Sequence, residues 1–150
     1  MNEKKKTILI VEDDKAIIET LKEVLQSEGY SVDTAETGRE AIQKSNAEFF
    51  NLALLDIKLR ARTKLLTLMH NNLPKMMKIM ITGYPSQQNA VEALNLGADA
   101  YVIKPVKPEE LLTLIEEKLK EQSQTEKMTE EEVTEWIKTR VRKLQHESQK

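Results

Sequence analysis

The stretch that decides the fold is Asn51-Leu-Ala-Leu-Leu-Asp-Ile-Lys-Leu-Arg-Ala-Arg62. A short apolar run over residues 52–55 ends there at a carboxylate, Asp56. Four apolar residues bounded by polar ones predict a strand that is buried on both faces of a sheet. A carboxylate inside such a strand would be costly unless it were paired or bound to a metal. At the carboxyl end of the strand, however, it lies where open α/β sheets bind their ligands.

Three other largely apolar runs, at residues 7–11, 77–81 and 100–103, predict further strands, residues 31–35 predict a weaker one, and helix signals lie between them. Asp14 is predicted to cap the first helix and Gly29 to end it. Thr37 and Glu40 form a capping box for the second helix. The other helices are predicted around Leu65, Leu66 and Met69, around Ala90, Val91 and Leu94 after a cap at Ser86, and from Pro108 through Leu119. Because strand and helix alternate five times, we expect an α/β fold with a doubly wound parallel sheet and helices on both faces.

The composition restricts the class of protein. A length of 150 residues suits one domain with a small appendage, and a net charge of -2 argues against a general nucleic-acid binder. The absence of cysteine excludes disulfides and thiolate metal sites. No run approaches the ~18 apolar residues of a membrane span, and the run at 7–11 is too short for a signal peptide. We therefore expect a cytoplasmic protein that contacts neither membrane nor nucleic acid directly.

The composition changes near Glu121. We expect a folded domain over residues 1–122, a polar linker over 123–128 and an amphipathic helix over 129–147 that opens with the capping box Thr129 and Glu132. Two heptads are too few to identify a coiled coil, so a helix docked on its own domain is an equal alternative. The apolar residues that fall roughly on one face of this helix are Val133, Trp136, Ile137, Val141 and Leu144.

Polar residues stand at the ends of four predicted strands: Glu12 and Asp13, Asp56, Thr82, and Lys104. The carboxyl ends of parallel strands converge on one edge of a sheet, so we expect these side chains to share a crevice. Clustered carboxylates favour a hard divalent cation, and Mg²⁺ suits a site with few carboxylates, water and a phosphate oxygen. Asp56 could then act as a nucleophile towards phosphorus, while Thr82 and Lys104 contact the phosphoryl oxygens.

Four motifs carry a resemblance to a known family: Ile-Leu-Ile-Val-Glu-Asp-Asp at 8–14, Leu-Leu-Asp-Ile-Lys-Leu at 54–59, Ile-Thr-Gly-Tyr-Pro-Ser at 81–86, and Leu-Gly-Ala-Asp-Ala-Tyr-Val-Ile-Lys-Pro at 96–105. Through these motifs, residues 6–122 resemble the receiver (CheY-like) domain of response regulators in bacterial and archaeal two-component systems. The resemblance implies a flavodoxin-like sheet of five parallel strands in the order 2-1-3-4-5.

The resemblance also implies the chemistry. Asp56 is expected to accept a phosphoryl group from a histidine kinase or phosphotransfer protein. The expected Mg²⁺ ligands are Asp13, Asp56, the backbone carbonyl of Lys58 and, through water, Glu12. The domain is then a phosphoacceptor and not an enzyme, apart from its self-catalysed phosphotransfer and autodephosphorylation.

The same resemblance predicts a conformational switch. Thr82 and Lys104 are expected to bind the phosphoryl oxygens, and Tyr101 to swing inward when Thr82 moves. The Lys104–Pro105 peptide bond is expected to be cis. The readout would be a surface made by the fourth helix, fifth strand and fifth helix, and a homodimer through that surface or through the tail helix is a further expectation.

One segment departs from the family pattern. Where the family usually continues Pro-Asp-x-x-Gly, residues 60–64 read Arg-Ala-Arg-Thr-Lys, and Leu65 follows about two residues early. Either the loop is shortened and the site intact, or Arg60 or Arg62 partly replaces the cation or attracts the anionic donor. The altered loop keeps open an alternative function, a receiver-like interaction module that works without phosphorylation. A phosphatase-type hydrolase is a weaker hypothesis, because Lys58 stands where such enzymes usually carry a second acid.

Overall fold

A computed structural model describes residues 5–56, 75–83 and 97–148 of the chain. The elements are β1 (Thr7–Glu12), α1 (Lys15–Ser27), β2 (Ser31–Ala35), α2 (Gly38–Ala47), β3 (Leu52–Asp56), β4 (Met77–Thr82), β5 (Ala100–Ile103) and α5 (Pro108–Ser148). The helices predicted around Leu65 and after Ser86, the carbonyl of Lys58 and the loop 60–64 lie outside the described residues. Within the described part, no helix has the length and apolar character needed to span a membrane.

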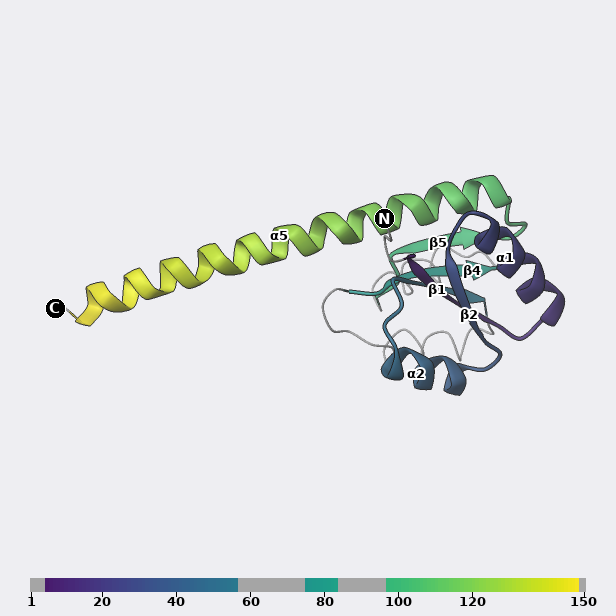
Figure 1. Cartoon of the computed structure of the whole chain (residues 1–150), viewed down its shortest axis with the longest axis horizontal. Helices are drawn as coiled ribbons and strands as arrows, with labels where there is room; N and C mark the ends of the chain where they lie inside the picture. The colour runs from purple at the N-terminus through teal and green to yellow at the C-terminus, as the bar shows by residue number, and fades with distance from the viewer. Residues whose placement is uncertain (1–4, 57–74, 84–96, 149–150) are drawn as a thin grey trace.

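The five strands form one parallel sheet in the order β2-β1-β3-β4-β5, which confirms the predicted fold class (Figure 1). Three strands run one residue further than predicted and so include Glu12, Asp56 and Thr82. The register places Glu12 beside Asp56 on neighbouring strands, and Thr82 beside Ile103. Glu12, Asp56 and Thr82 are therefore held within the sheet, at the carboxyl ends of their strands.

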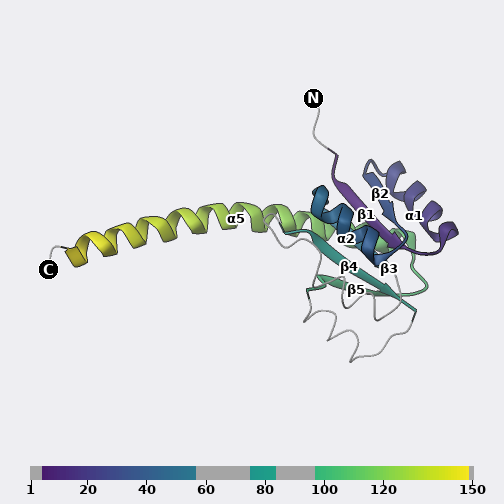
Figure 2. The same cartoon turned by 90° about the horizontal axis from the view of Figure 1, so that it is seen from below.

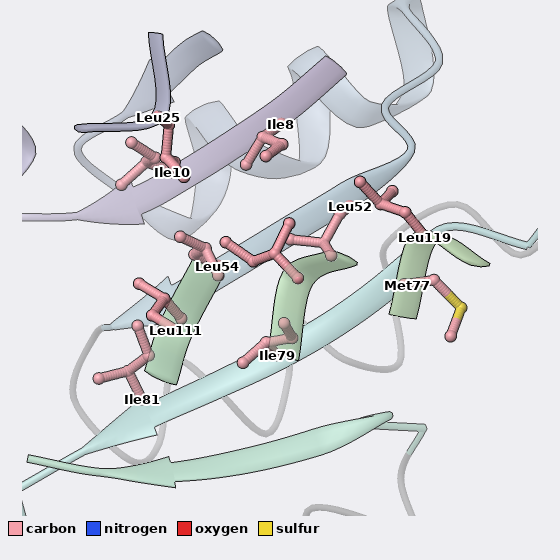
Figure 3. Packing of buried hydrophobic residues seen from close by; sticks show 11 residues of the cluster. Ile8, Ile10, Leu25, Leu52, Leu54, Met77, Ile79, Ile81, Leu111 and Leu119 are labelled. Carbon is pink, nitrogen blue, oxygen red and sulfur yellow. The ribbon is translucent and has the colours of Figure 1, made fainter. Parts of the chain in front are cut away.

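One face of the sheet is covered by α1 and by the first third of α5. Figure 3 shows how side chains of β1, β3 and β4 alternate towards this face and meet Leu25 of α1 and Leu111 and Leu119 of α5. A fully buried Leu or Ile side chain stabilises the fold by about 1.5–3 kcal/mol. The fully buried aliphatic residues of this cluster are Ile8, Ile10, Leu25, Leu52, Leu54, Ile79 and Ile115.

The opposite face carries a second cluster, to which α2 contributes Ala41. Leu9, Val11 and Leu55 alternate with the residues of the first cluster along their strands, as expected for strands buried on both sides. The predicted helices on both faces are thus present as α1 and α5 on one side and α2 on the other.

The helix termini follow the sequence signals. Asp14 caps α1, its Oδ1 accepting from the amides of Ala16 (2.9 Å) and Ile17 (3.3 Å). The helix is followed by Gly29 at φ +93°, a left-handed conformation that favours glycine. In α2 the Glu40 amide donates to Thr37 Oγ1 at 3.1 Å, as in a capping box. The Glu40 carboxylate accepts from the amide of Glu36, one residue before its usual capping-box partner.

The linker predicted at 123–128 is wrong, because α5 continues through it as one helix of 41 residues. Glu, Gln, Lys and Met are good helix formers, and the segment contains neither glycine nor proline, so polarity alone did not mark a break. The capping-box residues Thr129 and Glu132 therefore lie inside α5 and do not begin a helix. Figures 1 and 2 both show the second half of α5 projecting away from the sheet.

Gln122 fastens α5 to the sheet just before the helix leaves it. This side chain is 4% exposed, and its Nε2 donates to the backbone carbonyls of Asn51 (2.9 Å) and Lys75 (2.6 Å). Asn51 Nδ2 in turn donates to Gln122 Oε1 at 3.1 Å. Asn51 directly precedes β3, and Lys75 lies two residues before the start of β4.

Gln122→Ala is expected to lower the free energy of unfolding by about 1–3 kcal/mol, because the Lys75 carbonyl and the Asn51 side-chain amide lose a partner, while the Asn51 carbonyl keeps the amide of Met77 at 3.0 Å. The measurement is urea denaturation of the full chain. Gln124→Ala is the matched control, since Gln124 is exposed on the same helix. Equal losses in the two variants would contradict the assignment of Gln122 as an anchor.

Candidate functional site at the carboxyl edge of the sheet

The sheet brings four of the predicted site residues to one edge. Glu12, Asp56 and Thr82 are the last residues of β1, β3 and β4, which are neighbours in the sheet. Lys104 directly follows β5, and its amide donates to the carbonyl of Thr82 at 2.7 Å. The convergence expected from the strand pattern is therefore present for these residues.

Asp56 and Lys104 form an ion pair, with 2.8 Å between Oδ2 and Nζ. The Asp56 side chain is 11% exposed and that of Lys104 is 37% exposed, so the carboxylate is largely withdrawn from water while the ammonium remains accessible. The Lys104–Pro105 peptide bond is cis, as predicted. The pair spans the ends of β3 and β5 across the intervening β4.

Glu12 is the most unusual group of the site, because it is 3% exposed and one of its oxygens is poorly satisfied. Oε1 accepts from the amide of Asp14 at 3.0 Å, whereas Oε2 has no hydrogen-bond partner among the described residues. Burial raises the pKa of Glu12 to about 8, and Asp56 adds to the rise because only a protonated Glu12 carboxyl can share a hydrogen bond with it. Without a cation, the folded chain thus disfavours two carboxylates at this point.

The donor set fits a hard cation. The unsatisfied Oε2 of Glu12, the neighbouring carboxylate of Asp56 and the exposed Asp13 directly after β1 are oxygen donors of the kind that Mg²⁺ binds together with water. Within the described ranges, however, no three acidic or histidine side chains are close enough to form a metal cluster. The structure therefore does not assemble Glu12, Asp13 and Asp56 into one cluster, and the role of Asp13 stays a prediction.

Thr82 and Tyr101 lie close to the ion pair in the sheet. The Thr82 side chain is 2% exposed at the end of β4, and Tyr101 on β5 is half-buried against the cluster on the α2 face. Tyr101 pairs with Met80, two residues before Thr82. Thr82 therefore lies on β4, the strand that pairs with the strand of Tyr101.

A groove of about 650 Å³ adjoins the site and was not predicted from the sequence. Asp56 and Lys104 are among its lining residues, together with Ala16, Ile17 and Thr20 of α1 and the segment that leads into α5. Ala16 and Thr20 are one helical turn apart on the helix that begins just after the acidic residues, a spacing that could have indicated their place. The groove gives the Asp56 carboxylate an open, largely apolar approach.

Comparisons with known proteins agree with this geometry. The family model described as "Response regulator receiver domain" matches residues 8–116. The alginate biosynthesis transcriptional regulatory protein AlgB of Pseudomonas aeruginosa is 35% identical over 112 residues, which are 73% of this chain and 25% of AlgB. This chain therefore matches about a quarter of the length of that relative.

Solved structures show the same relationship. A response regulator receiver domain protein (CheY-like) from Methanospirillum hungatei is 48% identical, with a TM-score of 0.72, over 81% of this chain and 99% of that chain. The beryllofluoride-activated NtrC4 receiver domain dimer is 33% identical, with a TM-score of 0.71, over 77% of this chain and 98% of that chain. Phosphorylation of an aspartate by a kinase is the general function of the family, whose members generally bind Mg²⁺. From the family match and the fold together, the chain belongs to the response regulator receiver domains.

Proposed function

We propose that Asp56 is the phosphoacceptor of this receiver domain, that Lys104 and Thr82 contact the bound phosphoryl group, and that Glu12 and Asp13 help to hold Mg²⁺. The observation that carries the proposal is the 2.8 Å ion pair between Asp56 and Lys104 at the edge of the sheet. It gives a largely buried nucleophile beside a cation that remains partly accessible. A histidine kinase or a phosphotransfer protein is the proposed donor.

In the proposed transfer, a carboxylate oxygen of Asp56 attacks the phosphorus of a phosphohistidine. The new P–O bond forms as the P–N bond breaks, and the electron pair of the P–N bond leaves with the imidazole nitrogen. Lys104 then exchanges its contact with Asp56 Oδ2 for a phosphoryl oxygen, and the Thr82 hydroxyl donates to another. Bound Mg²⁺ would neutralise part of the charge on the carboxylates and the phosphoryl group. Glu12, Asp13 and the carbonyl of Lys58 would supply its further ligands, Glu12 through water.

The proposed switch starts from the same residues. Movement of Thr82 towards the phosphoryl group would leave space towards Tyr101, which is half-buried on the neighbouring strand β5 and pairs with Met80, two residues before Thr82. The altered face would include β5 and the start of α5, and we propose that this face, or the tail of α5, binds partners or a second copy. The alternative, an interaction module that works without phosphorylation, depends on the loop 60–64, which lies outside the described residues. The Asp56–Lys104 ion pair supports the phosphorylation-dependent function instead.

The test is the rate at which the chain gains one phosphoryl group from acetyl phosphate, followed by intact mass. The parent is expected to react with Mg²⁺ present and not after chelation. Lys104→Met is expected to react about 10²–10³ times more slowly, because one charged contact to the transferring group is lost. A parent that gains no phosphoryl group with Mg²⁺, or a variant that reacts as fast as the parent, would contradict the proposed function.

A further inference from the structure

The second half of α5 leaves the domain with apolar side chains in water. Every described side chain between 134 and 142 is exposed, including Ile137 at 50% and Val141 at 47%. These two residues are one helical turn apart and therefore share a face of the helix. Figures 1 and 2 both show this part of α5 beyond the edge of the sheet, so the described part of the domain does not cover that face.

We propose that this face binds the same face of a second copy, with the two α5 tails packed antiparallel. The sequence continues the apolar spacing on both sides of Ile137 and Val141, with Val133 four residues before Ile137 and Leu144 three residues after Val141. Such an apolar stripe is typical of a helix packed against a neighbour. A helix of this kind gains little stability by itself in water, because most helical stability comes from packing of the apolar face.

The distribution of charge selects a second copy as the occupant and antiparallel as the orientation. Residues 130–135 contain four glutamates and no base, whereas residues 138–143 contain four bases and no acid. A parallel pair would place acids beside acids and bases beside bases. An antiparallel pair places the acidic half of each tail beside the basic half of the other, which is complementary along its whole length.

The length of the free helix fits this arrangement. If the pair is centred on Ile137, Val133 lies beside Val141 of the second copy, and Ser148 reaches the level of residue 126, since both helices rise about 1.5 Å per residue. The overlap therefore ends just beyond Gln122, where α5 leaves its own domain. The two receiver domains lie at opposite ends of the pair and do not compete for the tail.

The cysteine-free chain allows a direct test of orientation. In the proposed register, Thr134 of one copy lies within one residue of the level of Val141 of the other. Two Thr134 residues are six residues apart, about 9 Å along the axis and beyond the reach of a disulfide. A mixture of full-length Thr134→Cys and Val141→Cys is therefore expected to form the mixed disulfide dimer, while neither variant links to itself. Self-linking of each variant would indicate a parallel pair and would overturn the proposal.

Sedimentation of the full chain tests the pairing itself. The parent is expected to be a dimer, and Ile137→Asn to weaken it about a hundredfold, because each dimer loses two buried side chains. Thr139→Asn is the matched control, as Thr139 is exposed on the opposite side of the helix and should leave the dimer unchanged. A monomeric parent, or equal weakening by both substitutions, would overturn the proposal.

Two charge variants add a test of complementarity. A chain with its four acids at 130, 131, 132 and 135 changed to lysine, and a chain with its four bases at 138, 140, 142 and 143 changed to glutamate, are each expected to be monomeric. Their equimolar mixture is expected to form a heterodimer; its absence would contradict pairing through the tails. The proposal does not depend on phosphorylation, so Asp56→Asn is expected to sediment like the parent.

Discussion

Asp56→Asn is expected to abolish the gain of a phosphoryl group from acetyl phosphate in the presence of Mg²⁺. The asparagine amide has nearly the same shape as the carboxylate but is not a nucleophile towards phosphorus, so the change removes the reacting oxygen and leaves the packing in place. The side chain is 11% exposed, and the substitution removes its ion pair with Lys104, whose ammonium is 37% exposed and can remain hydrated. The variant should therefore fold, and intact mass should show no adduct.

Asp14→Asn is the matched control for this prediction. Asp14 lies close to the site in the sequence, but its carboxylate caps α1 through the amides of Ala16 and Ile17. Asparagine is an equally good capping residue, so this variant should fold and gain the phosphoryl group as the parent does. An adduct on Asp56→Asn, or its loss in Asp14→Asn, would show that the acceptor has been assigned to the wrong residue.

Glu12→Gln is expected to raise the free energy of unfolding by about 2–4 kcal/mol at pH 8 without Mg²⁺. Glutamine keeps an oxygen for the amide of Asp14 and adds an N–H that can donate to Asp56, where the parent has an oxygen without a partner. The measurement is urea denaturation from pH 4.5 to pH 8 with a chelator present. Glu48→Gln is the control, because Glu48 is exposed and lies with Thr7 and Ser31 at the amino ends of the strands, opposite the site.

The sign of the pH dependence follows from the direction of the shift. The pKa of Glu12 is raised from 4.5 to about 8 in the folded chain, so between these values the folded state retains a proton that the unfolded state has released. The parent therefore loses stability as the pH rises through this window, and the loss is complete above about pH 8. The difference between Glu12→Gln and the parent should vanish near pH 4.5 and grow with pH.

Mg²⁺ is expected to reduce the stability advantage of Glu12→Gln over the parent. The proposed Mg²⁺ site uses the ionised carboxylates of the folded parent, so the ion should stabilise the parent more than Glu12→Gln and narrow the difference in unfolding free energy at pH 8. A difference in unfolding free energy that does not change between pH 4.5 and pH 8 would contradict the explanation given for Glu12.

The sequence predicted the sheet well because β1, β3, β4 and β5 are each marked by an apolar run with a polar residue at its end, whereas β2, which reads Ser-Val-Asp-Thr-Ala, gave a weaker signal. Asp56 and Lys104 were expected to share one crevice at the ends of their strands, and the structure places them 2.8 Å apart as an ion pair. Their roles in phosphoryl transfer, like those of Asp13, Thr82 and Tyr101, remain predictions.

Other features depend on contacts that no local pattern records. The burial of Glu12 beside Asp56 follows from the register of β1 with β3. This register cannot be read from the amino-acid sequence. Lys78 is 1% exposed in the middle of β4, where burial lowers its pKa, although its residue type suggested a solvated side chain. Gln122 was taken as the last residue of the domain, but its role as an anchor depends on carbonyls more than 40 residues away.

The unbroken course of α5 also has a mechanical consequence. Its first third is packed on the sheet through Leu111, Ile115 and Leu119, while the remainder has no glycine or proline at which it could bend. From Gln122 to Ser148 the helix is about 39 Å long. A tilt of about 10° where it rests on the domain would move its far end by about 7 Å, so the helix acts as a lever arm. A small change in the packing between α5 and the sheet would therefore move a partner bound at the tail by a larger distance.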